Sequence, residues 1–296
     1  MALKVDDFFG YSPSDSSLQA ATARIDKKCP FLEKICSKKF KSGTISGTCA
    51  VRPTTSGVVI CCPIRMYAGN YRILLEVAQT CFGANSRLIH DRAERSGDGN
   101  DVIVFGKRWG KELRLPSRAK HGGYFVDWIL ALLDQQGNLK EFVAVEVQTM
   151  DTSGSYETQV NALHSGNLNP PFSAKAGINW ENVSKRILPQ LIYKGHVLRR
   201  EPLCTKGMFF ICPKPVHERI ITRLGGNLQE YHPQPGSLTF RWYDLAEGAS
   251  NGTPRKLEFS GQKTTTIDQV ANAFTSPQNL PDARVYEKAI TAVLKD

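Results

Sequence analysis

The sequence of 296 residues predicts an α/β fold, in which a central mixed β-sheet flanked by helices follows a small cysteine-rich N-terminal module. Two observations support this prediction. From residue 71 onward, short apolar β-prone runs alternate with segments of helical periodicity. Residues 27–65, in contrast, are rich in Cys, Gly, Lys and Thr. We therefore divide the chain into an N-terminal segment, 1–70, and a larger α/β domain, 71–296.

Local patterns place the elements of the first part of the chain. The turn-forming residues 11–15 precede an apolar periodic stretch, so we expect a capped helix at Leu18–Ile25. The further elements expected before residue 120 are strands at Thr48–Arg52 and Gly57–Cys61, a helix at Tyr71–Phe82, and short strands at Asp101–Phe105 and Glu112–Leu115.

A β-hairpin is the clearest element of the sequence. The β-prone runs Tyr124–Leu133 and Glu141–Thr149 are separated by Asp134-Gln135-Gln136-Gly137-Asn138, a typical hairpin connection. Helix Trp180–Tyr193 is expected to kink at Pro189. The remaining expected elements are a helix at Ser155–Leu163, a strand at Gly207–Cys212, a helix at Val216–Leu224, a strand at Leu238–Leu245, and helices at Ile267–Phe274 and Ala283–Leu294.

The charge balance favours a polyanionic partner. Lys and Arg number 38 against 28 Asp and Glu, which gives a formal charge of +10. Basic side chains that neutralise phosphates release condensed counterions, and this strengthens binding to nucleic acid. The basic residues gather near 24–41, 107–120 and 185–200. Any one cluster is compatible with a solvated face, but three of them beside other informative residues favour nucleic acid.

The sequence contains neither an export signal nor a membrane span. The longest apolar stretches, such as Trp128–Leu133, are too short to cross a bilayer, and Met1–Gly10 lacks the apolar core of a signal peptide. We therefore expect a cytoplasmic protein. Its thiols should remain reduced there, and this favours metal binding over disulfides for a group of cysteines.

Two acids occupy unusual positions in the predicted hairpin. Side chains alternate between the faces of a strand, so Glu146 and Gln148 share a face with Phe142 and Ala144. An ionised carboxylate in an apolar strand is costly unless it is paired or bound to metal. If the strands pair, Asp127 approaches Glu146, and the two form a site for Mg²⁺. The alternative is a pair of edge-strand acids that are solvated or salt-bridged.

Four cysteines indicate a second, structural metal site. Cys29, Cys36, Cys49 and Cys62 are separated by six, twelve and twelve residues, and four thiolates suit a tetrahedral zinc or iron centre. Cys61 is an alternative ligand to Cys62, because neighbours in a strand face opposite sides. Without metal, these cysteines would be small buried hydrophobes. The other three fall on apolar patterns and are expected in the core: Cys81, Cys204 and Cys212.

These motifs together resemble the NotI-type restriction endonucleases, a family of the PD-(D/E)xK nuclease superfamily. The resemblance spans nearly the whole chain, whose length and composition are closest to the shorter members. Its central motif is the catalytic strand, in which Gln148 stands where the superfamily usually has lysine. The matching segments are Glu146–Asp151, Gly154-Ser155-Tyr156, Cys29–Leu32, Gly47-Thr48-Cys49, Cys62-Pro63, Phe8–Gly10, Phe125–Leu130, Asn182–Gln190 and Asn279-Leu280-Pro281.

The resemblance implies a restriction-endonuclease-like core in 71–296 and a type II enzyme of bacterial origin. Such enzymes are homodimers that cut double-stranded DNA at GC-rich palindromes containing GGCC, and they imply a cognate DNA methyltransferase in the host. Asp127, Glu146 and Gln148 match the active-site positions. Glu112 matches a further acidic position, although it is equally compatible with a surface acid that balances Lys111 and Arg114.

Recognition of the DNA sequence is expected to depend on Arg or Lys side chains that each donate two hydrogen bonds to a guanine base. By position, the candidates are Arg65, Lys185 and Arg186, although Arg186 suits a phosphate contact equally well.

Two rival functions remain open. A non-catalytic metal-knuckle DNA-binding protein explains the charge and the cysteines but not the two acids. A metal-dependent nuclease that acts on RNA or repair intermediates is disfavoured only by the family resemblance.

Overall fold

A seven-stranded mixed sheet forms the centre of the fold, in the order β14-β13-β12-β9-β8-β7-β6. The computed structural model describes residues 2–106, 112–113, 125–247, 251–276, 280 and 282–294. The strands of the sheet are β6 (Arg87–Ile89), β7 (Asp101–Gly106), β8 (Trp128–Leu133), β9 (Leu139–Val147), β12 (Met208–Pro213), β13 (Ser237–Leu245) and β14 (Leu257–Thr266). Because β12 is parallel to both neighbours while β8 is antiparallel to both of its own, the predicted mixed sheet is confirmed.

The predicted hairpin is β8–β9, in the interior of the sheet. Its register places Trp128 opposite Val145 and Leu132 opposite Glu141. The connection is a tight turn, in which the backbone N–H of Asn138 donates to the carboxylate of Asp134 at 2.7 Å. Gly137 has a φ of +86°, which glycine adopts at little cost.

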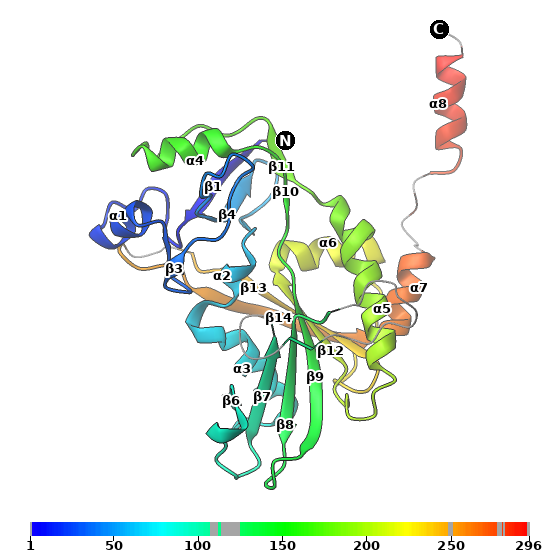
Figure 1. The fold of residues 1–296 in the computed structure, drawn as a ribbon. Helices are drawn as coiled ribbons and strands as arrows, with labels where there is room; N and C mark the ends of the chain where they lie inside the picture. The colour runs from blue at the N-terminus through cyan, green and yellow to red at the C-terminus, as the bar shows by residue number, and fades with distance from the viewer. Residues whose placement is uncertain are drawn as a thin grey trace.

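Helices cover both faces of the sheet (Figure 1). One face carries α5 (Leu188–Leu198), α6 (Lys214–Leu224) and α7 (Ile267–Thr275), which pack with Ala144 and Phe210 in one hydrophobic cluster. The other carries α2 (Pro63–Met66) and α3 (Ala68–Phe82), which pack with Val143, Val145 and Val147 in a second cluster. The two clusters confirm the predicted alternation along β9, with the valines on one side and Ala144 and Glu146 on the other.

The N-terminal residues form a smaller sheet in the order β1-β4-β5. Its strands are β1 (Leu3–Phe8), β4 (Thr48–Pro53) and β5 (Val59–Ile60). Between β1 and β4 lie α1 (Leu18–Ile25) and the two-residue strands β2 (Lys28–Cys29) and β3 (Lys34–Ile35). The remaining elements are η1 (Arg92–Glu94), β10 (Thr152–Gly154), α4 (Glu157–His164), β11 (Ala176–Ile178), the π-helical turn η2 (Val183–Ile187) and α8 (Val285–Val293).

Three expectations about the elements need correction. The helix expected at Trp180–Tyr193 is a π-helical turn, η2, followed by α5; Pro189 lies in the first turn of α5, where its missing N–H is not needed. Strands β1 and β14 were not expected, and β14 is polar along most of its length. Of the strand expected at Glu112–Leu115, residues 112 and 113 lie in no strand and the rest are outside the described residues. Within the described parts, no helix is long and apolar enough to cross a membrane.

Candidate active site

Asp127 and Glu146 meet in the middle of the central sheet. Asp127 directly precedes β8, and the register that pairs Trp128 with Val145 brings it beside Glu146 on β9. The backbone N–H of Val147 donates to Asp127 Oδ2 at 2.9 Å. The negative charge of Asp127 also acts on the pKa of Glu146, so the two carboxyl groups lie close together. Because β8 and β9 are interior strands, the two acids do not lie on an edge of the sheet. Asp127 is nevertheless exposed and Glu146 is salt-bridged to Lys194, as the alternative of solvated or salt-bridged acids expects.

The environment makes both acids harder to ionise. Burial, and then the negative charge of Asp127, raises the pKa of Glu146 from 4.5 to about 7. Asp127 is exposed to solvent. Loss of part of the hydration of its carboxyl group nevertheless raises the Asp127 pKa, and the negative charge of Glu112 raises it further. Two neighbouring carboxylates repel each other, and this repulsion favours the binding of a cation.

The buried cation at this site is Lys194, which the sequence did not single out. Its Nζ lies 2.5 Å from Glu146 Oε1, and the residue is only 7% exposed. In the part of the chain that the structure describes, it is the one Lys or Arg that forms an ion pair with either acid. The helical spacing of Lys194 from Leu191 and Leu198 could have predicted its burial, because all three lie on the buried face of α5.

Gln148 follows β9 and is held mainly by the main chain. Its backbone N–H donates to the carbonyl oxygen of Ile211 on β12 at 3.0 Å. Its side-chain Nε2 donates to the carbonyl oxygen of Thr149 at 2.8 Å. The amide is partly buried and carries no charge, so it adds a polar group to the site without adding a cation.

The acid pair suits a hard divalent cation, although it supplies only part of a coordination shell. Carboxylate oxygens are the ligands that Mg²⁺ prefers, and a bound cation would relieve the repulsion between Asp127 and Glu146. Glu112 is exposed and near enough for its charge to act on Asp127. Among the described residues, however, no three His, Cys, Asp or Glu side chains lie close enough to hold a metal ion. Asp127 and Glu146 are therefore the candidate metal ligands, and Glu112 is their acidic neighbour.

The expected four-cysteine metal site is not assembled. Cys29 and Cys62 lie near enough to Cys49 for their charges to act on it, and the backbone N–H of Cys62 donates to the Cys49 carbonyl oxygen at 3.2 Å. Cys36, however, packs against the other hydrophobic cluster, which contains Cys61. No described group of three such ligands has metal-binding geometry, and burial raises the pKa of Cys62 to about 11. As placed, the four thiols do not fit a tetrahedral centre.

Cys61 and Cys62 face opposite sides, as strand alternation predicts. Cys62 belongs to the hydrophobic cluster that contains Cys49, whereas Cys61 belongs to the other cluster. Lys38 Nζ donates a hydrogen bond to Cys61 Sγ at 3.3 Å. The three cysteines expected in the core, Cys81, Cys204 and Cys212, are all buried. Of the two adjacent thiols, Cys62 is the one on the side of Cys49.

Arg65, expected by position to read DNA, lies inside the protein rather than on its surface. The residue is completely buried on α2. Its Nε lies 3.2 Å from Asp7 Oδ2 on β1, and its guanidinium group lies 4.4 Å from the ring centre of Phe31. It also donates to the carbonyl oxygen of Arg255. This position indicates that Arg65 ties the N-terminal sheet to α2.

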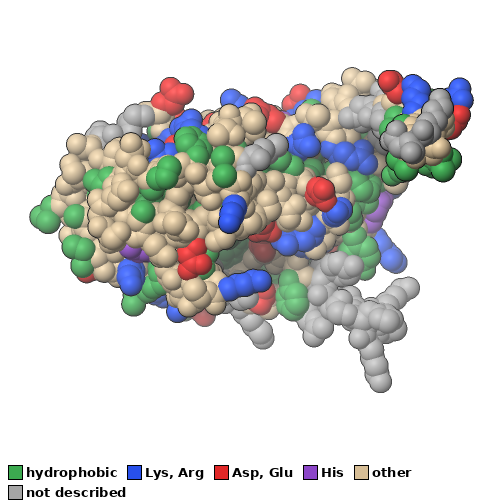
Figure 2. All heavy atoms as spheres, turned by 90° about the horizontal axis from the view of Figure 1, so that it is seen from above, with side chains coloured by type: hydrophobic (Ala, Val, Ile, Leu, Met, Phe, Trp, Pro, Cys, Tyr) green, Lys and Arg blue, Asp and Glu red, His purple; other side chains and the backbone are tan. Residues whose placement is uncertain are grey.

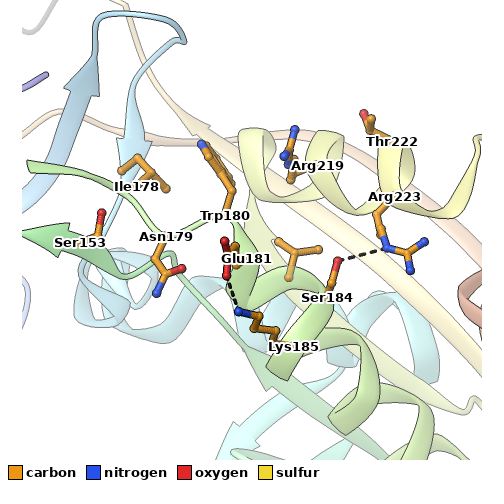
Figure 3. A pocket seen from close by; sticks show the side chains of 11 residues that line it. Ser153, Ile178, Asn179, Trp180, Glu181, Ser184, Lys185, Arg219, Thr222 and Arg223 are labelled. Carbon is orange, nitrogen blue, oxygen red and sulfur yellow. Dashed lines mark hydrogen bonds and ion pairs between the residues drawn. The ribbon is translucent and has the colours of Figure 1, made fainter. Parts of the chain in front are cut away.

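Lys185 and Arg186 remain accessible on η2. Lys185 pairs with Glu181, and Arg186 lies 3.6 Å from Asp151. Lys185 lines a pocket of about 680 Å³ beside Trp180, with Arg219 and Arg223 of α6 on the opposite wall (Figure 3). Lys and Arg side chains are spread over the face seen from above, with acidic side chains among them (Figure 2). The cluster at 107–120 lies largely outside the described residues.

Comparison with known proteins found one matching family. The family model described as restriction endonuclease NotI matches residues 16–253. The match includes Asp127, Glu146, Gln148 and Lys194, as well as the four cysteines. A search of curated proteins found no match.

Proposed function

Because the chain belongs to the NotI restriction endonuclease family, which makes it a nuclease acting on DNA, we propose that it is a type II enzyme with its active centre at Asp127, Glu146 and Gln148. The proposed substrate is double-stranded DNA with a GC-rich palindrome that contains GGCC. One observation carries the proposal: the register of β8 and β9 places Asp127 beside Glu146, and the Glu146 side chain is largely buried.

The proposed reaction is hydrolysis of a phosphodiester bond. A water molecule gives up a proton to solvent as its oxygen bonds to phosphorus, the bond from phosphorus to the 3′-oxygen breaks, and the leaving oxygen takes up a proton from solvent. Asp127 and Glu146, with Glu112 nearby, would hold Mg²⁺. When bound, the ion supplies positive charge and lowers the pKa of water. Gln148 would orient the attacking water by hydrogen bonding.

The remaining parts of the proposal concern the rest of the molecule. The cysteines Cys29, Cys36, Cys49 and Cys62 would hold a structural iron or zinc ion, and this requires all four thiols, Cys36 most of all, to come closer together than the structure places them. A palindromic site needs a two-fold symmetric dimer, so we propose a homodimer. Lys185 and Arg186 would contact DNA, since both remain accessible. A cognate methyltransferase would protect the host DNA.

Digestion of a plasmid of known sequence tests this function. We expect discrete bands from the wild-type protein with Mg²⁺ and none from Glu146→Ala. Glu230→Ala is the matched control, because Glu230 is an exposed acid and should leave the bands unchanged. A protein that retards DNA but never cuts it at any Mg²⁺ concentration would be a metal-knuckle DNA-binding protein. A smear would indicate a nuclease without site specificity.

A further inference from the structure

The proposed active site lacks the positive charge that a nuclease of this design usually has beside its acids. Gln148 occupies the position where a lysine would hold the attacking water and supply charge to the transition state. An amide can form the hydrogen bonds but cannot supply the charge. Its Nε2 is also engaged with the carbonyl oxygen of Thr149 at 2.8 Å. The missing charge must therefore come from another part of the chain or from metal alone.

Lys194 brings such a charge to the same place from a different element. It lies on α5, which covers the face of the sheet that Glu146 and Ala144 share. Its ammonium group contacts Glu146 Oε1 at 2.5 Å, and Glu146 in turn lies close to Asp127. The positive charge of Lys194 thus lies directly beside the acid pair.

A structural role alone is a weak explanation for this lysine. Removing an ammonium and a carboxylate from water costs several kcal/mol per ion, and an apolar pair of similar size is often at least as stable. Lys194 nevertheless occupies the buried stripe of α5, where Leu191 and Leu198 are its neighbours. A buried charge kept at this cost, next to candidate catalytic acids, points to a function.

The packing of α5 also fixes the position of Lys194. The adjacent Gly195 is buried, and a Cβ atom added there would lie 2.2 Å from Cδ1 of Ile267 on α7. With Ile267 placed as it is, the approach of α5 to α7 leaves no room for a side chain at position 195. This close packing holds the backbone that carries the lysine.

We propose that Lys194 takes over the role of the lysine that position 148 lacks. Its ammonium group, held beside Glu146, orients that carboxylate and supplies positive charge where negative charge develops on the cleaved phosphate. The inference rests on the proposed function, and it adds a positioning residue from α5 to the acids of β8 and β9. Charge placed beforehand at such a position accelerates a reaction, because it needs no reorganisation.

The test combines removal of the charge with its return at position 148. Lys194→Met keeps the aliphatic stem and removes the ammonium group. At saturating Mg²⁺ we expect its single-turnover cleavage rate to fall by roughly 10²–10³-fold. Its affinity for the same DNA in Ca²⁺ should stay near the wild-type value. Its melting temperature should fall, because Glu146 loses its partner, so the rates are compared at a temperature where both proteins are folded. The double variant Gln148→Lys/Lys194→Met should recover at least about tenfold of the lost rate, because it restores a cation beside Glu146.

Lys140→Met is the matched control. Lys140 is exposed on the same strand, about 20 Å from Glu146 by the rise of a β-strand, so its removal should not change the rate. If Lys194→Met does not fold, Lys194→Gln replaces it, because its amide can still bond to Glu146.

Two results would overturn the proposal. If Lys194→Met cuts at the wild-type rate, Lys194 only neutralises the charge of Glu146 when no metal is bound. If the variant is slow and the double variant is no faster, Lys194 only supports the structure. Failure of the proposed function is a separate result, since in that case the wild-type protein itself would cut no DNA.

Discussion

Lys194 Nζ on α5 lies 2.5 Å from Glu146 Oε1 on β9, and this ion pair joins a covering helix to the centre of the sheet. Glu146 also lies close to Asp127, which directly precedes β8. Three elements that are separate in the sequence therefore meet at one group of charges.

Removing the charge of Asp127 should stop cleavage without unfolding the protein. In Asp127→Asn, the side-chain amide oxygen can still accept the hydrogen bond from the Val147 N–H, which spans 2.9 Å in the wild type. We expect at least about a 10³-fold loss of cleavage rate, because a metal ligand and its charge are lost. Retention of DNA in Ca²⁺ should remain, as gel-shift titration would show. A variant that cuts normally would remove Asp127 from the active centre.

Cleavage at limiting Mg²⁺ should depend on pH through Glu146. Its pKa is raised to about 7, so below that pH a proton competes with the metal for this carboxylate, which also faces Asp127 and Lys194. The half-saturating Mg²⁺ concentration should rise about tenfold for each pH unit below 7, and this group should have no further effect above it. Cleavage rates at several Mg²⁺ concentrations between about pH 5.5 and about 8.5 would measure this dependence.

The raised pKa of Glu146 has the opposite effect on folding stability in the absence of metal: it favours the folded state at low pH. Glu146 holds its proton more tightly in the folded state than in the unfolded chain, where its pKa is near 4.5. The stability that this group contributes is fully present below pH 4.5 and is lost as the pH rises through about 7. In Glu146→Gln, this part of the pH dependence of the melting temperature should disappear. If the two proteins show identical profiles, the Glu146 pKa is not raised.

The sequence predicted the hairpin well because the signal is local. Strand alternation and the turn 134–138 determine the register, and the register alone brings Asp127 to Glu146. Lys194 was recognised only as part of a basic cluster, because its contact with Glu146 spans 48 residues of the chain and depends on how α5 docks. Arg65 was chosen by position, although its partner Asp7 lies 58 residues away on β1. Long-range pairing of this kind leaves little trace in local periodicity.

Arg65 should prove necessary for folding rather than for reading DNA. Arg65 and Asp7 are both fully buried, and removing one partner of a buried ion pair costs about 3–5 kcal/mol. Arg65→Met should therefore lower the free energy of unfolding by about this amount, measured by urea titration. At a temperature where the variant is folded, its cleavage pattern should match that of the wild type.

A double variant separates the ion pair from other effects at this position. Asp7→Leu/Arg65→Met removes both charges, and it should recover part of the lost stability because no uncompensated buried ion remains. A changed cleavage site in folded Arg65→Met would show instead that Arg65 contacts DNA.

Elemental analysis of the purified protein tests the proposed structural metal. We expect one iron or zinc ion per chain in the wild type, and its loss in Cys49→Ser, because a closed site needs all four thiolates. Cys81→Ala is the matched control, since Cys81 is buried on α3 among core residues. A wild-type protein without bound iron or zinc would leave the cysteines as buried hydrophobes. Retention of metal in Cys36→Ser would exclude Cys36 as a ligand.

The close packing of α5 against α7 should be necessary for the position of Lys194. In Gly195→Ala, the new methyl group would lie 2.2 Å from Ile267 Cδ1, so the Ile267 side chain or the helices themselves must shift. We expect a loss of about 1–3 kcal/mol in the free energy of unfolding, as for other overpacked cores. Cleavage should slow more than this loss of stability explains, because the ammonium group shifts away from Glu146. Gly195→Ala/Ile267→Ala makes room for the methyl group and should restore cleavage, even though Ile267→Ala alone leaves a cavity that destabilises the protein. If the double variant cuts no faster than Gly195→Ala, the spacing of the two helices does not control the site.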